Sequence, residues 1–244
     1  AGTAILCSIN GLMIQTYSQD PDMISIILEF LTVLPEEVRM PKLGMAPIRR
    51  KQLVEAAIAA IHEHGFANAT VARIAAQAGI SAGMVHHYFK DKDELLFATM
   101  RHLLAELRAD AVERLSRTAD ATGRIRAIID ACFGDAQFDE QVFSAWLALY
   151  GNARHSPRLM NILSLYHRRL RSSLLHDLRR LVPEAEALRL ADGIAAMIDG
   201  LWLRYALTGK PANPETPRAL TRDYLAAALA HTSNLDRAGL KMLA

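Results

Sequence analysis

Apolar residues recur every three or four positions along most of the chain, and this helical spacing limits the folds that it can adopt. Leu53, Ala57 and Ile61 lie four apart and fall on one face of a helix expected at about 47–64. Further helices are expected at about 70–78, 81–88, 92 to beyond 107, 122–132, 138–153, 156–181, 184–208 and 215–230. We find no sustained two-residue alternation of the kind that marks strands. The sequence therefore predicts an all-α protein.

Composition places the chain among ordinary globular proteins. It has 244 residues, of which 51% are hydrophobic and 22% charged, with a net charge of +2. Residues 1–39 carry five acidic residues against one Arg, whereas residues 40–108 carry nine Lys or Arg against six acidic residues. The two cysteines, Cys7 and Cys132, are too few and too far apart in sequence for a disulfide framework. No apolar run reaches the about 18 residues that a membrane span needs. The apolar N-terminal stretch lacks the basic flank of a signal peptide. We therefore expect a cytoplasmic protein without a membrane span.

The two short helices expected at 70–78 and 81–88 are separated by a tight turn at Gly79, which is the pattern of a helix-turn-helix. Such a unit places its second helix in the major groove of DNA, with residues near the start of that helix reaching base edges. Val85 and Phe89 are expected to pack inward. Contacts with double-stranded DNA are predicted for Arg49, Arg50, Thr70, Ser81, Gly83, Met84, His86, His87, Tyr88, Lys90 and Lys92.

Other roles for the adjacent histidines are disfavoured. Two neighbouring residues of one helix do not easily bind one metal ion, and no further ligands stand at a suitable spacing. His86 and His87 also lack a nearby nucleophile with which to form a catalytic pair. We therefore predict no metal, no cofactor and no catalytic residue. The remaining alternative is a solvated helix pair in an ordinary bundle.

Residues 49–104 resemble the DNA-binding domain of TetR-family repressors. The shared pattern appears as GISAG at 79–83 and HYFKDKDELL at 87–96. The resemblance implies a homodimer that binds a palindromic operator through two half-sites. The family usually has Tyr at the position of His86, and Tyr88 can supply the phosphate contact instead.

A narrower resemblance extends over about residues 40–230. The segments MPKLGMAPIRRKQL (40–53), WLALYGNARHSPRL (146–159) and AAMIDGLWLRYAL (195–207) are similar to those of choline-responsive repressors of glycine betaine synthesis. The resemblance implies a C-terminal helical bundle that binds choline and forms the dimer. One alternative is a TetR-type repressor with a different cationic or lipophilic inducer. A less favoured alternative is a helical enzyme with an incidental helix-turn-helix pattern.

A quaternary ammonium donates no hydrogen bond, so proteins hold it with aromatic faces and a carboxylate. Trp146 and Tyr150 lie four apart on one predicted helix, and Asp199 lies three residues before Trp202 on another. These four residues are predicted to form a ligand-binding box, with Asp139 as a second candidate carboxylate. The alternative is that the aromatic residues simply belong to the core.

The expected organisation has four parts: a non-family extension at 1–39, a DNA-binding domain at 40–92, a ligand-binding and dimerisation domain at 93–230, and a tail at 231–244. Residues 24–39 can form an amphipathic helix, and we interpret 1–39 as a leader ahead of Met40, or else as an accessory dimer contact. A face carrying Ala191, Ile194, Ile198 and Leu201 serves either the dimer or an internal core.

Overall fold

The structure is a computed structural model that describes residues 4–9, 12–17, 45–208 and 213–242. Side chains are described over residues 46–208 and 213–232. The chain divides into two compact units, Ala1–Met45 and Ala46–Ala244. The amphipathic helix expected at 24–39 lies outside the described residues.

The first unit contains a two-stranded hairpin, which differs from the expectation of a chain without strands. Strand β1 (Ala4–Ile9) pairs antiparallel with β2 (Leu12–Tyr17), so that Ile9 lies opposite Leu12. The two residues between the strands in the sequence are Asn10 and Gly11, a dipeptide that favours tight hairpin turns. From residue 45 onward the described chain is helical, which confirms the all-α fold class for that part.

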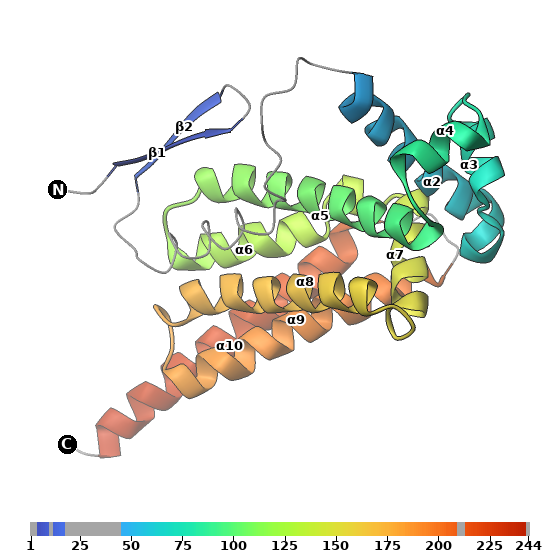
Figure 1. The fold of residues 1–244 in the computed structure, drawn as a ribbon. Coiled ribbons are helices and arrows are strands. Elements are labelled where there is room, and N and C mark those ends of the chain that lie inside the picture. The colour runs from blue at the N-terminus through green and yellow to red at the C-terminus, as the bar shows by residue number, and fades with distance from the viewer. Residues whose placement is uncertain (1–3, 10–11, 18–44, 209–212, 243–244) are drawn as a thin grey trace. The chain divides into compact units, whose positions relative to one another are not determined.

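Three helices begin the second unit and gather around the first turns of a fourth, long helix (Figure 1). They are α2 (Met45–Asn68), α3 (Val71–Gln77), α4 (Ala82–Tyr88) and α5 (Lys92–Ser116). Thr70 and Ser81 cap α3 and α4, because their hydroxyl oxygens accept from the backbone N–H groups three residues ahead. Gly65 interrupts α2 near its end, and Gly79 makes the turn between α3 and α4. Both have a positive φ, of 72° and 66°, which glycine adopts without steric cost.

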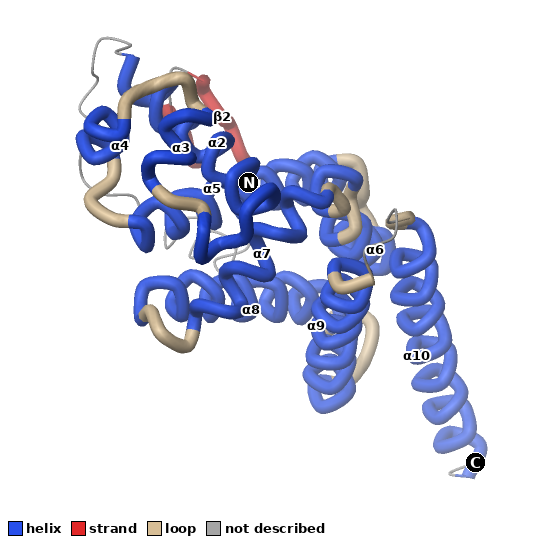
Figure 2. The backbone as a smooth tube through the Cα atoms, turned by 90° about the vertical axis from the view of Figure 1, so that its right-hand side faces the viewer, coloured by secondary structure: helices blue, strands red, loops and turns tan. Residues whose placement is uncertain are grey.

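The rest of the unit is a bundle of helices built on α5. Its members are α6 (Ala121–Cys132), a short 3-10 helix η1 (Asp135–Gln137), α7 (Glu140–Ala153), α8 (Pro157–Leu178), α9 (Glu184–Ala206) and α10 (Glu215–Met242). Helix α5 packs against α6, α7 and α8, and α9 packs against α8 and α10. Figure 2 shows α10 running alongside α9 and past it. Helix α10 therefore continues through most of the expected tail.

One buried apolar cluster runs from the helix-turn-helix into the bundle. The expected inward face of α2 is confirmed, since Leu53, Ala57 and Ile61 are buried, and so are Val85 and Phe89 around α4. On α9 the choice between dimer and core is settled for three of the four residues, because Ala191, Ile194 and Ile198 are buried within the single chain. None of the described helices is both long and apolar enough to span a bilayer.

An ion pair with a buried carboxylate joins the start of α6 to the end of α8. Asp177 is 1% exposed, and the Nε of Arg124 donates to both of its carboxylate oxygens at 3.0 and 3.1 Å. Arg180 reaches the same carboxylate at 3.4 Å. The Arg124 side chain is 24% exposed, so the pair stabilises the fold mainly through the hydrogen bonds that satisfy the buried carboxylate.

We therefore expect Asp177→Asn to lower the free energy of unfolding by about 2 kcal/mol, because the buried amide loses the charge-assisted hydrogen bonds with Arg124. Chemical denaturation with helicity as the signal would measure the change. The matched control is Asp192→Asn, because Asp192 forms an exposed pair with Arg171 and its loss should change stability little. Equal effects of the two substitutions would contradict the structural role of the buried carboxylate.

Candidate nucleic-acid interface and aromatic cavity

Helix α4 presents a mixed face of the kind that can enter a DNA groove. His86 and His87 are exposed, Met84 is 42% exposed, and Val85 turns into the core. A Cβ placed on Gly83 would meet no heavy atom within 4 Å, so the backbone there is open to close approach. The exposed side chains project from the first and second turns of α4, where base-reading residues stand in such units.

The residues that flank α4 differ in exposure and in the contacts that they make within the chain. Thr70 and Ser81 are exposed at the starts of α3 and α4, and the side chain of Lys90 is also exposed. Arg50 donates to the carbonyl oxygen of Tyr88 at 2.9 Å and lies over the ring of Phe89 at 4.5 Å, so it also holds α2 to the end of α4. The remaining contacts are internal: Arg49 donates to Gln52, and His87 meets the edge of the half-buried Tyr88 ring.

Lys92, one of the predicted DNA contacts, also makes contacts within the chain. Its ammonium donates to the carbonyl oxygens of Phe66 and Ala67 and lies 4.1 Å from the Phe66 ring centroid. Partial burial lowers the pKa of Lys92, while Asp93 acts in the opposite direction. The Lys92 charge therefore closes the C-terminal end of α2, where carbonyl groups lack helical partners.

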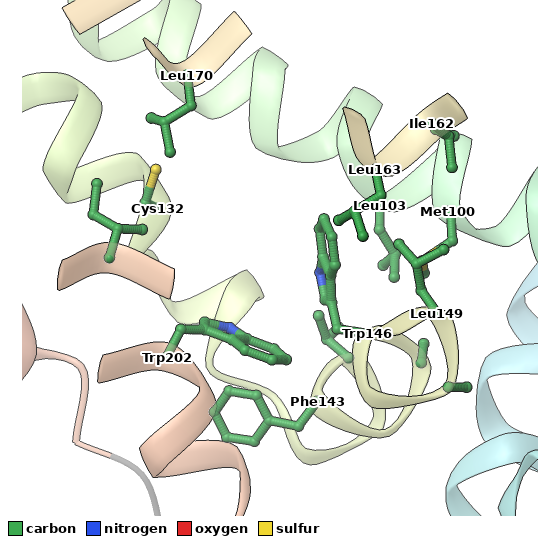
Figure 3. Close-up of a cluster of buried hydrophobic side chains, with 14 of the residues drawn as sticks. Met100, Leu103, Cys132, Phe143, Trp146, Leu149, Ile162, Leu163, Leu170 and Trp202 are labelled. Atoms are coloured by element: carbon green, nitrogen blue, oxygen red, sulfur yellow. The ribbon is translucent and has the colours of Figure 1, made fainter. Parts of the chain in front are cut away.

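Four aromatic rings from three helices converge inside the bundle. Trp146 and Tyr150 come from α7, Tyr166 from α8 and Trp202 from α9. The Trp146 ring centroid lies 6.0 Å from that of Tyr150, 5.3 Å from that of Tyr166 and 6.0 Å from that of Trp202. Figure 3 shows the two tryptophans facing the same space, with Phe143 beside Trp202. The rings line a small cavity whose lining residues are Leu107, Cys132, Gln137, Trp146, Tyr150, Tyr166, Ile198, Asp199 and Trp202.

Asp199 supplies the carboxylate of this cavity. Its Oδ1 accepts from the Tyr166 hydroxyl at 3.3 Å, and its Oδ2 lies 3.4 Å from the Nε2 of His167. Burial raises the pKa of Asp199, whereas His167 and the Tyr166 hydrogen bond act in the opposite direction. Burial also raises the pKa of Tyr150, and the charge of Asp199 adds to that effect. A carboxylate among aromatic faces has the composition of a cation-binding box.

The structure thus brings together four of the five predicted ligand-binding residues. Asp139 lies elsewhere: it is exposed and caps α7, accepting from the backbone N–H groups of Gln141 and Val142. A carboxylate at that position complements the N-terminal end of the helix rather than the cavity.

Besides the apolar Leu107 and Ile198, three cavity residues were not expected from the sequence. Tyr166 completes the aromatic wall, Cys132 contributes from α6, and the carbonyl oxygen of Gln137 accepts from the Trp202 Nε1–H at 3.2 Å. Helical spacing does not reveal them, because they lie on elements other than α7 and α9 and only packing places them here. Among the residues that the structure describes, no group of three or more acidic, His or Cys side chains is placed to hold a metal ion.

Helix α7 also contacts the helix-turn-helix domain. The Nδ1 of His62 on α2 lies 3.0 Å from the Oγ of Ser144 on α7. Because the Ser144 hydroxyl donates to the carbonyl oxygen of Glu140, the imidazole is the donor in this bond. Ser144 stands two residues before Trp146, so one short stretch of α7 faces both the cavity and α2.

Comparison with known proteins gives two family matches. Residues 53–99 match the bacterial regulatory proteins of the tetR family, and residues 121–230 match the C-terminal domain of BetI-type transcriptional repressors. Two curated relatives carry the name HTH-type transcriptional regulator BetI. The protein of Agrobacterium fabrum is 45% identical over 76% of this chain and 90% of that protein, and the protein of Rhizobium meliloti is 46% identical over 78% and 94%.

Solved structures share the fold. A putative transcriptional regulator from Pseudomonas aeruginosa superposes with a TM-score of 0.64 at 27% identity, covering 80% of this chain and 96% of that one. A putative transcriptional regulator from Saccharomonospora viridis, solved in complex with choline, has a TM-score of 0.64 at 20% identity and covers 72% and 95%.

The buried thiol in the cavity leads to a test of this geometry. Burial, with smaller contributions from Asp199, Asp110 and Asp130, raises the pKa of Cys132 to about 12. The neutral thiol is therefore favoured in the folded protein, and the reactive thiolate is scarce below that pH. In a Cys7→Ser background, we expect iodoacetamide at about pH 8 to leave the folded protein unmodified and to label it fully in denaturant. Rapid labelling of the folded protein, followed by mass spectrometry, would contradict the burial of this cavity wall.

Proposed function

The chain belongs to the tetR family of bacterial regulatory proteins and is a BetI-type transcriptional repressor, and from this premise we propose that it senses choline and controls genes of glycine betaine synthesis. The observation that carries the proposal is the box of Trp146, Tyr150, Tyr166 and Trp202 closed by the Asp199 carboxylate. The shared name of its relatives and the choline bound by a regulator of the same fold support the choice of ligand.

The chemistry of the box suits a quaternary ammonium. Aromatic faces attract a cation without needing a hydrogen-bond donor on it, and the attraction grows when water is excluded. Trp146 and Trp202 are 4% and 7% exposed, so their faces are already removed from solvent. The Asp199 carboxylate adds a compensating charge that an uncharged ligand would not use. These features favour a small organic cation over the lipophilic inducer considered as the alternative.

Operator recognition is assigned to the exposed face of α4 and the residues around it. His86, His87 and Met84 can reach base edges, whereas Thr70, Ser81 and Lys90 can contact phosphates. One such unit reads few base pairs, so we propose that two copies of the chain form a two-fold dimer on a palindromic operator in the cytoplasm.

An exposed stripe on α9 suits the dimer contact. Ala196, Gly200, Leu203 and Leu207 follow a spacing of four, three and four residues and are all exposed in the single chain. Leu203 and Leu207 are 40% and 67% exposed. Small residues at one end of the stripe allow helices to approach closely, and leucines at the other end supply apolar area.

Ligand is expected to act through α7. Binding would move the rings of Trp146 and Tyr150, and the Ser144–His62 bond would pass a shift of α7 to α2. The ligand can shift the balance between two spacings of the DNA-binding domains only by its different affinity for the two states. The ligand-free dimer is then the form that binds the operator, and choline relaxes or releases it.

The first test is a titration of the purified chain with choline, followed by tryptophan fluorescence and calorimetry. We expect saturable binding that weakens at least about tenfold in Trp146→Ala and in Asp199→Asn, since each removes an attraction to the cation.

The matched control is Asp192→Asn, which removes an exposed carboxylate from the same helix and should leave choline affinity unchanged. If the folded wild-type protein does not respond to choline at tens of millimolar, the choline proposal is wrong, and the chain remains a BetI-type repressor with another ligand.

DNA contacts give a second test, measured as operator affinity over a range of salt concentrations. Lys90→Ala should weaken binding to all sequences and reduce the salt slope by about 1, because a phosphate contact releases a counterion. His87→Ala should instead change which bases are preferred.

Arg154→Ala, an exposed change at the end of α7, is the control and should alter neither property. Lys92→Ala is expected to lower thermal stability as well as affinity, because its ammonium closes α2. Equal losses for Lys90→Ala and His87→Ala on operator and random DNA would rule out this division of roles.

A further inference from the structure

The Asp199 carboxylate has two partners on helix α8. Tyr166 and His167 are neighbours on α8, and they reach the two different oxygens of Asp199 on α9. Tyr166 lines the cavity, whereas the His167 side chain stands outside the lining and is 45% exposed. The carboxylate therefore lies between the aromatic cavity on one side and a solvent-accessible imidazole on the other.

Most of the described groups that face Asp199 are neutral. Tyr150 from α7 and Cys132 from α6 face it as neutral groups, since burial raises the pKa of each. The Tyr166 hydroxyl is neutral for the same reason, and α5 contributes the apolar Leu107 to the lining. Of the groups in the described part of the chain that shift the pKa of Asp199, His167 is the one that can become a cation.

We propose that His167 is an internal counter-cation that competes with the cationic ligand for Asp199, which makes it a residue that tunes ligand affinity. This inference rests on the proposed binding of a quaternary ammonium in the cavity. When His167 is protonated, its charge satisfies the carboxylate and repels a second cation nearby. When His167 is neutral, the carboxylate is free to compensate the ligand. By reciprocity, binding of the ligand favours loss of the proton from His167.

The direction of the pH effect follows from this competition. Histidine side chains change charge between about pH 5 and pH 8, so affinity for the cation should rise with pH across that range. A different role would give the opposite result for a substitution. If His167 served mainly to keep the buried Asp199 ionised, its removal would favour the protonated carboxyl and weaken binding at low pH.

Calorimetric titration with choline separates these roles, using the full chain at about pH 6 and about pH 8. The wild-type protein should bind about three- to fivefold more tightly at the higher pH, the size expected for a partly exposed charge pair. His167→Gln keeps a hydrogen-bonding side chain without the titrating charge. It should bind at about pH 6 at least as tightly as at about pH 8, and more tightly than wild type does at the lower pH.

Two further measurements complete the design. Titrations at about pH 6 in buffers of different ionisation enthalpy should show proton release by the wild-type protein and little release by His167→Gln. His155→Gln, an exposed change between α7 and α8 outside the cavity lining, should behave as wild type.

Weaker binding by His167→Gln at the lower pH, or the same pH dependence in both proteins, would overturn the competition. Absence of choline binding by the wild-type protein at both pH values is a different outcome, because it rejects the proposed ligand and with it the competitor role.

Discussion

Burial of one face of α5 connects the helix-turn-helix domain to the bundle. Leu95 and Leu96 pack with α2 and α3, and Met100 and Leu103 continue the same buried face toward α7 and α8. No break in the helix separates the two sets, so the apolar core is continuous across the boundary. Close-packed cores switch between arrangements more readily than they deform gradually. In the proposed mechanism, a shift of the bundle against α5 would therefore reach the helix-turn-helix.

Helix α7 contacts both the aromatic cavity and helix α2. Its apolar face places Trp146 in the cavity, while Ser144 on a neighbouring position bonds His62 of α2. The helix is short and capped by Asp139, and it follows a loop that includes η1, whose Gln137 accepts from Trp202. One segment, α7 with the loop before it, thus forms part of the cavity wall and also makes the contact with α2. In the proposed mechanism, a ligand that repositions the tryptophans would act on all three together.

Local signals in the sequence predicted much of the fold. Helix starts followed from caps such as Thr70 and Ser81, and the inward face of α2 followed from its spacing, because both depend on neighbours within one turn. The hairpin at 4–17 was not predicted, since its signal is a single Asn-Gly dipeptide between short strands. Site residues on α7 and α9 were grouped by spacing, but Tyr166 and His167 depend on how α8 packs. The helix-end contacts of Lys92 and Asp139 were not foreseen, because a charged residue at or beside a helix end gives the same sequence signal as one that contacts a ligand.

The arrangement of the two tryptophans has an optical consequence. Their ring centroids lie 6.0 Å apart with planes inclined at 65°. Two indoles so close and so inclined share their excited states, and they absorb polarised light as a coupled pair rather than as two separate rings. The far-ultraviolet circular dichroism of the protein, where the strong indole transition lies, would then carry a signed couplet whose shape depends on the angle between them. The circular dichroism spectrum would therefore report a change in the packing of α7 against α9 without any added dye.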